Sequence, residues 1–415
     1  MTRTVPTSDA RLRVAYVTMA FPAAPETFAT NDVLALRRSG VDVTVHALRP
    51  AVRDAARLLA ERDLLDLPVT HNGVRATLAG VGAILARPGR ALELAGWIAR
   101  HTWRRPTQLL RSLMVVPRAV DVYRHIEVER PDVVHLFWGH YPAIVARLVQ
   151  RYSPDIVVSM FLGAHDLRVR YGGSGPVARS ADVVWTHTAA NVPIIRALGV
   201  TGDGPVVAYR GVDLRRLRDV AARTPKTPKR VVTAGRLVPS KGIDDVLRGF
   251  ARVVAAHPDA TLTVLGDGPE KSALERLAAS LGVRDSVRFR GHQPQEQAFQ
   301  EMAQAEVLLF LSRVESLPNV IKEAMAVGTV CVSSKTSGIE ELVSDGEHGF
   351  LVDHGDVEAA AVAVSRLLSD VGLRTQMAEA ARRHVEAHFD LERTMARYRD
   401  TWVELVRSRR NSAEA

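Results

Sequence analysis

The stretch "RVVTAGRLVPSKGIDDVLRGFARVVAAHPDATLTVLG", residues 230–266, has a short β-branched run at each end and an amphipathic run, "DDVLRGFARVVAAH", between them. This strand–helix–strand pattern recurs along most of the chain. Strand-type runs occupy residues 13–20, 41–48, 132–137, 155–161, 182–187, 205–210, 230–235, 261–266, 287–291, 306–312, 329–334 and 349–352. Alternation over the whole length predicts an α/β fold with two open parallel sheets covered by helices.

The length suggests two domains. A chain of 415 residues is long for one core and suits two domains of about 200 residues each. The stretch 213–229 is basic, interrupted by prolines and weakly periodic, so we place the linker there. An N-terminal domain, 1–212, and a C-terminal domain, 230–391, follow from this boundary. Residues 392–415 predict a final helix, which could cap the second domain or cross back to the first.

Composition narrows the class of protein. Apolar residues make up 47% and charged residues 24% of the chain, which is ordinary for a globular protein. No uncharged apolar run approaches the ~18–20 residues of a membrane span, and the first residues lack an apolar signal core, so we expect no secretion. The single cysteine, Cys331, excludes an internal disulfide and a cysteine-based zinc site. We expect it to be a small buried residue of a strand.

The net charge of +9 suits nucleic acid, an anionic membrane or anionic substrates. The sequence contains no zinc-finger spacing, no RNA-binding aromatic signature and no dense basic tail. Nucleic acid is therefore not expected as a partner.

The segment 84–130 departs from the alternation. It is helical in pattern, rich in arginine, and carries Trp97 and Trp103. Basic amphipathic helices with tryptophans can lie on anionic membranes. The alternative, which we favour, is a helical insertion packed on its own domain, because the apolar face is uneven and Pro106 and Pro117 interrupt it.

"VESLPNVIKEAMAVG", residues 314–328, follows a strand-type run and carries two glutamates, Glu315 and Glu323. Pro318 suits the first turn of a helix, Ser316 can cap it, and free N–H groups at that end bind anions. Ligands of open parallel sheets bind at this end of the strands. Such a site would hold a nucleotide sugar if one carboxylate lay near the sugar, the helix amides bound the phosphates, and the second carboxylate bound the ribose. The alternative is a pair of solvated glutamates on a surface helix.

"GRLVPSKG", residues 235–242, places Arg236 and Lys241 on a turn between a strand and a helix. These cations suit a diphosphate, although they could also be a solvated loop pair. Gly338, in "KTSGIEEL", permits close backbone approach. The chain contains no Asp-x-Asp, so we expect no metal ion, and the charge of a diphosphate would be met by side chains and helix ends.

An ordered series of stretches now shows a family resemblance. "GRLVPSKGIDDVLRGFA", "LTVLGDGPEKSALERLAASLGVRDSVRFRGH" and "VLLFLSRVESLPNVIKEAMAVGTVCVSSKTSGIEELVSDGEHGFLV" resemble the donor half of the family-4 retaining glycosyltransferases, which have the GT-B fold. "MAFPAAPETFATNDVLALRRSGVDVTVHAL" is similar to the opening of members that build bacterial exopolysaccharides, including the colanic-acid type. "YRGVDL" matches the turn that ends the first domain.

The resemblance implies roles for individual positions. Glu315 matches the carboxylate that faces the donor sugar, and Glu323 the one that holds the ribose. Arg236 and Lys241 match the phosphate-binding cations. The other donor-binding positions that we expect are Ser316, Leu317, Asn319, Val320, Arg290, Gly291, His292 and Gly338. The GT-B fold would place them in a cleft between two Rossmann-like domains. Ser316 departs from the family, which usually has glycine there.

A second departure concerns the His-Gly-x-Asp motif of the family, because this chain has "SMFLGAHDLRV" instead. If Asp166 is aligned, Gly163 stands at the histidine position; if Gly163 is aligned to the glycine, Leu162 does. His165 lies next to Asp166, and we consider it a candidate for the donor site or a structural histidine. His140 is a further candidate, as is His135, which on a strand is more typical of the border of the core.

The sequence and the resemblance together predict a retaining, metal-independent hexosyltransferase that uses a UDP-sugar or GDP-sugar and no cofactor. The acceptor would be a glycan or a lipid-linked glycan at the inner face of a membrane, with the protein cytoplasmic or peripherally attached. Two alternatives remain at this point: a nucleotide-sugar epimerase on the same fold, and a non-catalytic member that binds a nucleotide sugar or a partner.

Overall fold

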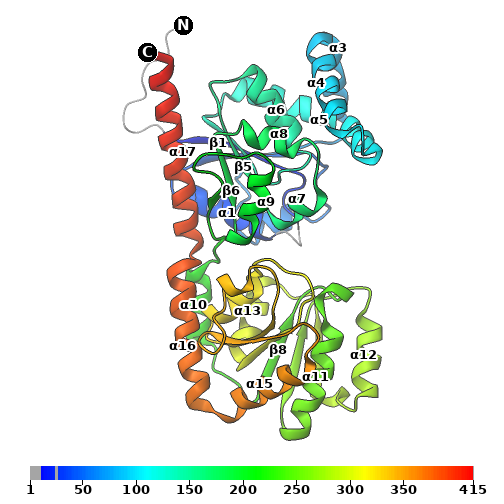
Figure 1. The fold of residues 1–415 in the computed structure, drawn as a ribbon, viewed down its shortest axis with the longest axis vertical. Coiled ribbons are helices and arrows are strands. Elements are labelled where there is room, and N and C mark those ends of the chain that lie inside the picture. The colour runs from blue at the N-terminus through cyan, green and yellow to red at the C-terminus, as the bar shows by residue number, and fades with distance from the viewer. Residues whose placement is uncertain (1–10, 24–26, 415) are drawn as a thin grey trace. The chain divides into compact units, whose positions relative to one another are not determined.

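The computed structural model of the protein describes residues 11–23 and 27–414. Within them the chain forms two compact units. Unit 1 comprises the described residues of 1–187, 191–208 and 392–415, and unit 2 comprises 188–190 and 209–391. Each unit has a parallel sheet of its own (Figure 1). Residues 24–26, part of the N-terminal stretch that shows the resemblance, lie outside the described residues.

The sheet of unit 1 has seven strands in the order β3-β2-β1-β4-β5-β6-β7. Their bounds are β1 Arg13–Thr18, β2 Asp42–Ala47, β3 Val69–His71, β4 Val133–Leu136, β5 Val157–Phe161, β6 Val183–Thr186 and β7 Val206–Val207. Strands covered on both faces read as continuous β-branched runs, which is why six of the seven are visible in the sequence. β3 was missed because its three residues form no such run.

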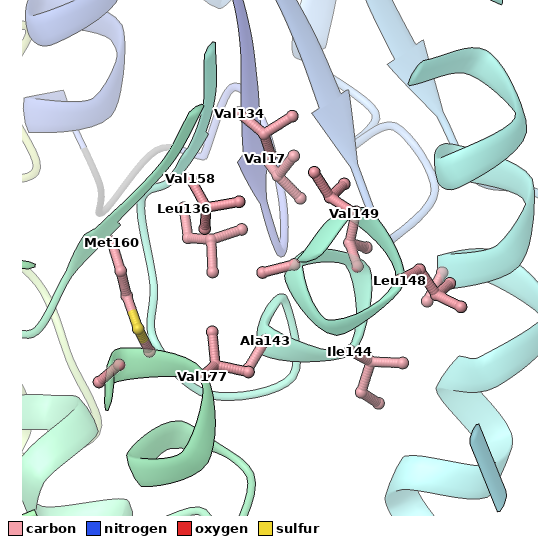
Figure 2. Packing of buried hydrophobic residues seen from close by; sticks show 14 of the residues in the cluster. Val17, Val134, Leu136, Ala143, Ile144, Leu148, Val149, Val158, Met160 and Val177 are labelled. Carbon is pink, nitrogen blue, oxygen red and sulfur yellow. The ribbon is translucent and has the colours of Figure 1, made fainter. Parts of the chain in front are cut away.

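Helices cover both faces of this sheet. The helices of unit 1 are α1 Thr27–Arg38, α2 Ala55–Ala60, α3 Val74–Ala86, α4 Pro88–Thr102, α5 Pro106–Glu129, α6 Ala143–Tyr152, α7 Ala164–Val169, α8 Ser174–Arg179, α9 Val192–Ala197 and α17 Leu391–Glu414, with a 3-10 turn, η1 Ala189–Asn191, that begins in unit 2. Strand side chains such as Val17 and Leu136 lie on the side of the sheet that faces Ala143 and Val149 of α6 (Figure 2). These residues belong to one buried hydrophobic cluster of unit 1.

The helical segment 84–130 is resolved into parts of α3, α4 and α5, which lie together at one side of unit 1 (Figure 1). Pro106 begins α5, as a proline at the first helical position can. Pro117 does not interrupt the helix as we expected: α5 continues through it to Glu129. Buried residues beyond the proline, among them Val122 and Ile126, pack on the core and compensate for the lost backbone hydrogen bond.

α3 and α5 pack against each other at one small residue. A Cβ on Gly80 of α3 would lie 1.8 Å from the carbonyl oxygen of Pro117. Only glycine therefore permits this approach of the two helices.

The sheet of unit 2 has six strands in the order β10-β9-β8-β11-β12-β13. They are β8 Arg230–Ala234, β9 Thr261–Leu265, β10 Val287–Gly291, β11 Val307–Phe310, β12 Val330–Ser334 and β13 Gly349–Val352. The helices are α10 Leu214–Arg223, α11 Ile243–Ala256, α12 Lys271–Ser280, α13 Gln295–Gln304, α14 Asn319–Ala326, α15 Val357–Ser369 and α16 Val371–His388, and the 3-10 turns are η2 Pro239–Lys241, η3 Arg284–Ser286 and η4 Ile339–Glu341. Cys331 is fully buried in β12, and burial raises the pKa of its thiol.

A helix stands where we placed most of the linker. α10 is capped by the Asp213 carboxylate, which accepts a hydrogen bond from the backbone N–H of Arg216. Its apolar residues Leu214, Leu217 and Val220 are buried in the core of unit 2. The basic residues that suggested a linker lie on the outer face of this amphipathic helix.

The last helix, α17, packs in unit 1 from Glu392 onward. Tyr398 stacks on Trp185 of β6 at 3.9 Å between ring centroids, and the buried Trp402 lies 5.2 Å from the ring of His135. His135 is therefore part of the core, as its place on a strand suggested. No helix among the residues described is both long and apolar enough to cross a membrane.

Candidate functional site

Two loops of unit 2 meet where its strand order reverses. β8 and β11 are neighbours in the sheet, although they are far apart in sequence. The chain leaves β8 into residues 235–242 and leaves β11 into residues 311–318. The carboxyl ends of parallel strands at such a switch point are where ligands of open α/β sheets bind.

These loops bring Lys241 and Glu315 into contact. The Lys241 ammonium donates to the Glu315 carboxylate, and both side chains are largely shielded from solvent. Ser312 Oγ donates to the same carboxylate oxygen at 3.1 Å. We expect the cation and the carboxylate at different parts of a donor, but here they form an ion pair with each other. An anion that enters must compete with Glu315 for the lysine.

Arg313, which we did not single out in the sequence, holds the turn that carries Lys241. Its guanidinium donates to Asp244 at 2.8 Å and to Asp245 at 2.7 Å, and its backbone N–H donates to Ser240 at 2.9 Å. The hydrogen bond to Asp244 is the main cause that raises the pKa of Arg313. Arg313 therefore holds η2 and the start of α11 in a fixed position relative to each other.

Glycines allow the backbone to close around this turn. Gly242 has φ +61°, and a Cβ there would lie 2.0 Å from the carbonyl oxygen of Leu311. Gly266 and Gly268, after β9, approach the loop of Arg236 equally closely, with hypothetical Cβ distances of 1.9 Å and 2.4 Å to backbone oxygens. The loop after β8 is packed between its two neighbours and can hold a side chain in a defined place.

Arg236 projects from this loop. Its side chain is exposed, and among the described residues none holds its guanidinium in an ion pair or hydrogen bond. It is available to an anion in a way that Lys241 is not.

The next structural feature is the start of α14. The helix begins at Asn319, and Pro318 is its N-cap, with φ −68° and ψ 128°. No side chain caps the helix, so our expectation that Ser316 caps it is wrong: Ser316 lies two residues before the cap. The first amides of α14 are left for another acceptor.

Lys322, also not singled out from the sequence, anchors this helix start. Its side chain is fully buried, and its ammonium donates to the Arg210 carbonyl at 2.7 Å and to Asn319 Oδ1 at 2.9 Å. A buried ammonium is stable only when such acceptors surround it. Lys322 thereby orients the Asn319 side chain. Glu323, the next residue, is partly exposed.

Gly338 is placed against the same loop. It has φ +81°, and a Cβ there would lie 2.8 Å from the Ser316 carbonyl oxygen. Leu317 is buried, and Val320 is partly exposed on the first turn of α14. Ser316, Leu317, Val320 and Gly338 therefore share one part of unit 2.

Residues 290–292 lie at the carboxyl end of β10. Gly266 N–H donates to the Gly291 carbonyl at 2.9 Å, which joins this loop to the end of β9. Arg290 forms an ion pair with Glu301 at 3.3 Å, and His292 is exposed. Because β9 lies between β10 and β8, this loop and Lys241 are at the same edge of the sheet, with one strand between the strands that they follow.

Unit 1 contains a separate polar cluster around Asp166. This buried carboxylate accepts from Gly139 N–H at 2.9 Å and Gly163 N–H at 3.1 Å, and it contacts His140 Nδ1 at 3.0 Å. His165 is exposed, 5.8 Å from the His140 ring between centroids. Asp166 therefore fixes the loops after β4 and β5, and its histidine contact is with His140.

The chain is similar in sequence to known glycosyltransferases. The sequence profile of the family described as "Glycosyl transferases group 1" matches residues 217–384, a range that contains Arg236, Lys241, Glu315 and Glu323. The lipopolysaccharide core biosynthesis glycosyltransferase LpsE of Rhizobium meliloti is 31% identical over 290 residues, which are 65% of this chain and 80% of LpsE. This chain belongs to the group 1 glycosyltransferases. The amylovoran biosynthesis glycosyltransferase AmsK of Erwinia amylovora is 25% identical and aligns over 91% of this chain and 96% of its own.

Solved structures support the fold of this group 1 glycosyltransferase. Anabaena HepE, crystallised in complex with UDP, superposes with a TM-score of 0.71 at 18% identity over 95% of this chain and 100% of HepE. A sucrose-phosphate synthase of Thermosynechococcus elongatus gives a TM-score of 0.68 at 16% identity, over 96% and 100% of the two chains. The predicted GT-B class is confirmed, with two parallel Rossmann-like sheets. The colanic-acid type stays a prediction.

Proposed function

We propose that this glycosyltransferase is retaining and metal-independent, and that it moves a hexosyl group from a UDP- or GDP-sugar to a glycan or lipid-linked acceptor in bacterial surface polysaccharide synthesis. The observation that carries the proposal is the contact between Lys241 and Glu315 at the switch point of the unit 2 sheet. The uncapped start of α14 lies on the loop that follows Glu315. The named relatives in lipopolysaccharide core and amylovoran biosynthesis support the polysaccharide setting.

We base the proposed role of each side chain on its charge. The diphosphate of the donor meets Arg236, Lys241 and the first amides of α14, which stabilise negative charge as the diphosphate leaves. When Lys241 turns to the phosphate, Glu315 is released from it and is placed to face the sugar. Glu323 accepts from the ribose hydroxyls, and Arg290, Gly291 and His292 border the base.

The transfer then proceeds on one face of the sugar. The acceptor oxygen bonds to the anomeric carbon while the bond from that carbon to the diphosphate oxygen breaks. The acceptor hydroxyl proton passes to the departing phosphate oxygen. Attack from the face that the diphosphate leaves retains the configuration, without the second carboxylate that a double-displacement glycosidase requires.

The donor proposal is tested with a panel of UDP- and GDP-sugars in the presence of EDTA. We expect slow release of UDP or GDP from one donor, and loss of that release in Glu323→Ala. Glu379→Ala serves as the matched control, since Glu379 is an exposed glutamate of α16 in the same unit. Release that depends on a divalent metal would overturn the metal-independent part. Failure to bind any donor would overturn the whole assignment.

We also propose peripheral attachment to the inner face of an anionic membrane, on the basis of the net charge of +9. Electrostatic attachment is screened by salt. Purified protein should therefore co-sediment with anionic vesicles at low salt and be released at high salt. Binding that is absent at low salt would contradict the attachment.

A further inference from the structure

α3 is unlike the other surface helices. Its thirteen residues, "VRATLAGVGAILA", carry one charge, Arg75. A helix that is apolar all round is normally buried in a core or in lipid. α3 instead packs on α5 at Gly80 and leaves most of its surface uncovered.

The outer face of α3 is a stripe of large apolar side chains. Val74, Leu78 and Leu85 are 78%, 65% and 74% exposed, and Val81 lies between them on the same face. Residues spaced four, three and four apart share one side of a helix. Exposed apolar groups of this density mark an interaction surface.

The inner face of α3 lines a cavity of about 1040 Å³ in unit 1. This volume is at the upper end of the ~300–1,000 Å³ of small-molecule sites. Its walls are mostly apolar, and alanines on α3 leave the space open. Representative lining residues are Ala76, Ala79 and Ala83 of α3, Leu94 of α4, Val120 of α5 and Leu148 of α6.

The remaining lining is cationic on balance. Four arginines, Arg75, Arg87, Arg90 and Arg124, line the cavity together with two carboxylates, Asp121 and Glu127. Arg87 and Arg90 share Glu127, and Arg124 pairs with Asp121. Arg75 has no side-chain partner among the residues described. An apolar interior with excess positive charge fits an apolar chain that ends in an anionic headgroup.

We propose that the cavity between α3, α4 and α5 holds one acyl chain of an anionic phospholipid, while the outer stripe of α3 lies in the membrane interface. At 1.5 Å per residue α3 is about 20 Å long, short of the ~30 Å hydrocarbon core, so it lies in the interface rather than spanning it. Both the outer stripe of α3 and its cavity-lining face need an apolar environment. We favour a lipid over a second copy of the chain because a membrane can supply that environment to both faces. The inference deepens the proposed membrane attachment and is independent of the donor.

The test uses the full chain and two forms of phosphatidylglycerol. Calorimetry with monomeric lysophosphatidylglycerol, below its micelle concentration, measures the cavity; co-sedimentation with phosphatidylglycerol vesicles measures the interface. Ala83→Phe fills the cavity, with Ala79→Leu as a second filling variant. Leu85→Gln is the matched control, since Leu85 is exposed on the same helix and does not line the cavity.

We expect one lysolipid per wild-type chain, at least a tenfold weaker lysolipid affinity in either filling variant, and an affinity within twofold of wild type in Leu85→Gln. Leu85→Gln should lower vesicle binding about tenfold. Equal lysolipid binding by the wild type and the folded filling variants would overturn the proposal. Binding of a prenyl phosphate but not the lysolipid, or a dimer that covers α3, would also overturn it. Donor release on the same samples shows separately whether the transferase assignment fails.

Discussion

Glu315→Gln should make the enzyme bind UDP or GDP more tightly while it turns over more slowly. Glutamine has nearly the shape of glutamate but no charge, so Lys241 loses its ionic partner. The lysine is then free for a phosphate without first breaking that contact. If Glu315 acts at the donor sugar, the same change removes its contribution to the transition state.

The size of the affinity gain follows from the burial of the pair. The Lys241 and Glu315 side chains are 22% and 15% exposed, so the pair is neither fully exposed nor fully buried. An ion pair on the open surface contributes ~0.2–1 kcal/mol, whereas removing one partner of a buried pair costs ~3–5 kcal/mol. After allowance for solvent screening and for the hydrogen bond that glutamine can still accept, we expect about 1 kcal/mol. This corresponds to a Kd for the nucleotide about fivefold lower. Turnover should fall about 100-fold or more.

Calorimetric titration of UDP and GDP at 0.1 M salt measures the binding, and donor release measures the turnover. Lys241→Met is the control, because it removes the cation that we propose binds phosphate and should weaken nucleotide binding with or without Glu315→Gln. The double variant gives the coupling of the two residues. An unchanged or higher Kd in Glu315→Gln would refute the idea that Glu315 competes with the diphosphate for Lys241.

Three further variants test the surroundings of the site. Gly242→Ala should lower the free energy of unfolding by about 3 kcal/mol, measured in urea, since its Cβ would lie 2.0 Å from the Leu311 carbonyl oxygen; a loss under 1 kcal/mol would show that the turn relaxes. Lys322→Met should raise KM for the donor about tenfold while the fold is kept, because the ammonium no longer joins Arg210 to Asn319, and an unchanged KM would make its role purely structural. Burial, with the neighbouring His348 and His388, lowers the pKa of His384 from 6.5 to about 4, so stability should be complete above pH 6.5 and fall toward pH 4. Because His384 is partly exposed, solvent screening reduces the expected loss to about 1–2 kcal/mol; His384→Gln should flatten that part of the urea-unfolding profile.

Much of the fold could be predicted because it depends on local pattern. Twelve of the thirteen strands coincide with β-branched runs, since strands buried on both faces must be apolar throughout. β3 is too short to leave such a pattern, and α10 was hidden because basic residues cover its outer face. The local pattern of apolar residues shows which side of a long segment is buried. It does not show which short segments become strands or helices through tertiary contacts.

The residues that support the site could not be found in this way. Arg313 binds aspartates 68 and 69 positions away, and Lys322 donates to a carbonyl 112 positions away. Such partners are defined only once the sheet brings distant loops together. The contact of Asp166 with His140 has the same cause, because the loops that carry these two residues follow the adjacent strands β4 and β5.

The position of α17 has a consequence for how the chain is made. Unit 1 is interrupted by residues 209–391, and its last helix supplies Tyr398 and Trp402 to the face of the sheet that holds Trp185 and His135. A ribosome adds roughly 5–20 residues per second, so the ~180 intervening residues take about 10–40 s. During that time the part of unit 1 that precedes residue 209 waits with this aromatic face uncovered. Unit 1 is thus begun before unit 2 and completed after it. Until α17 is made, the uncovered aromatic face of unit 1 is where a nascent-chain chaperone would be needed.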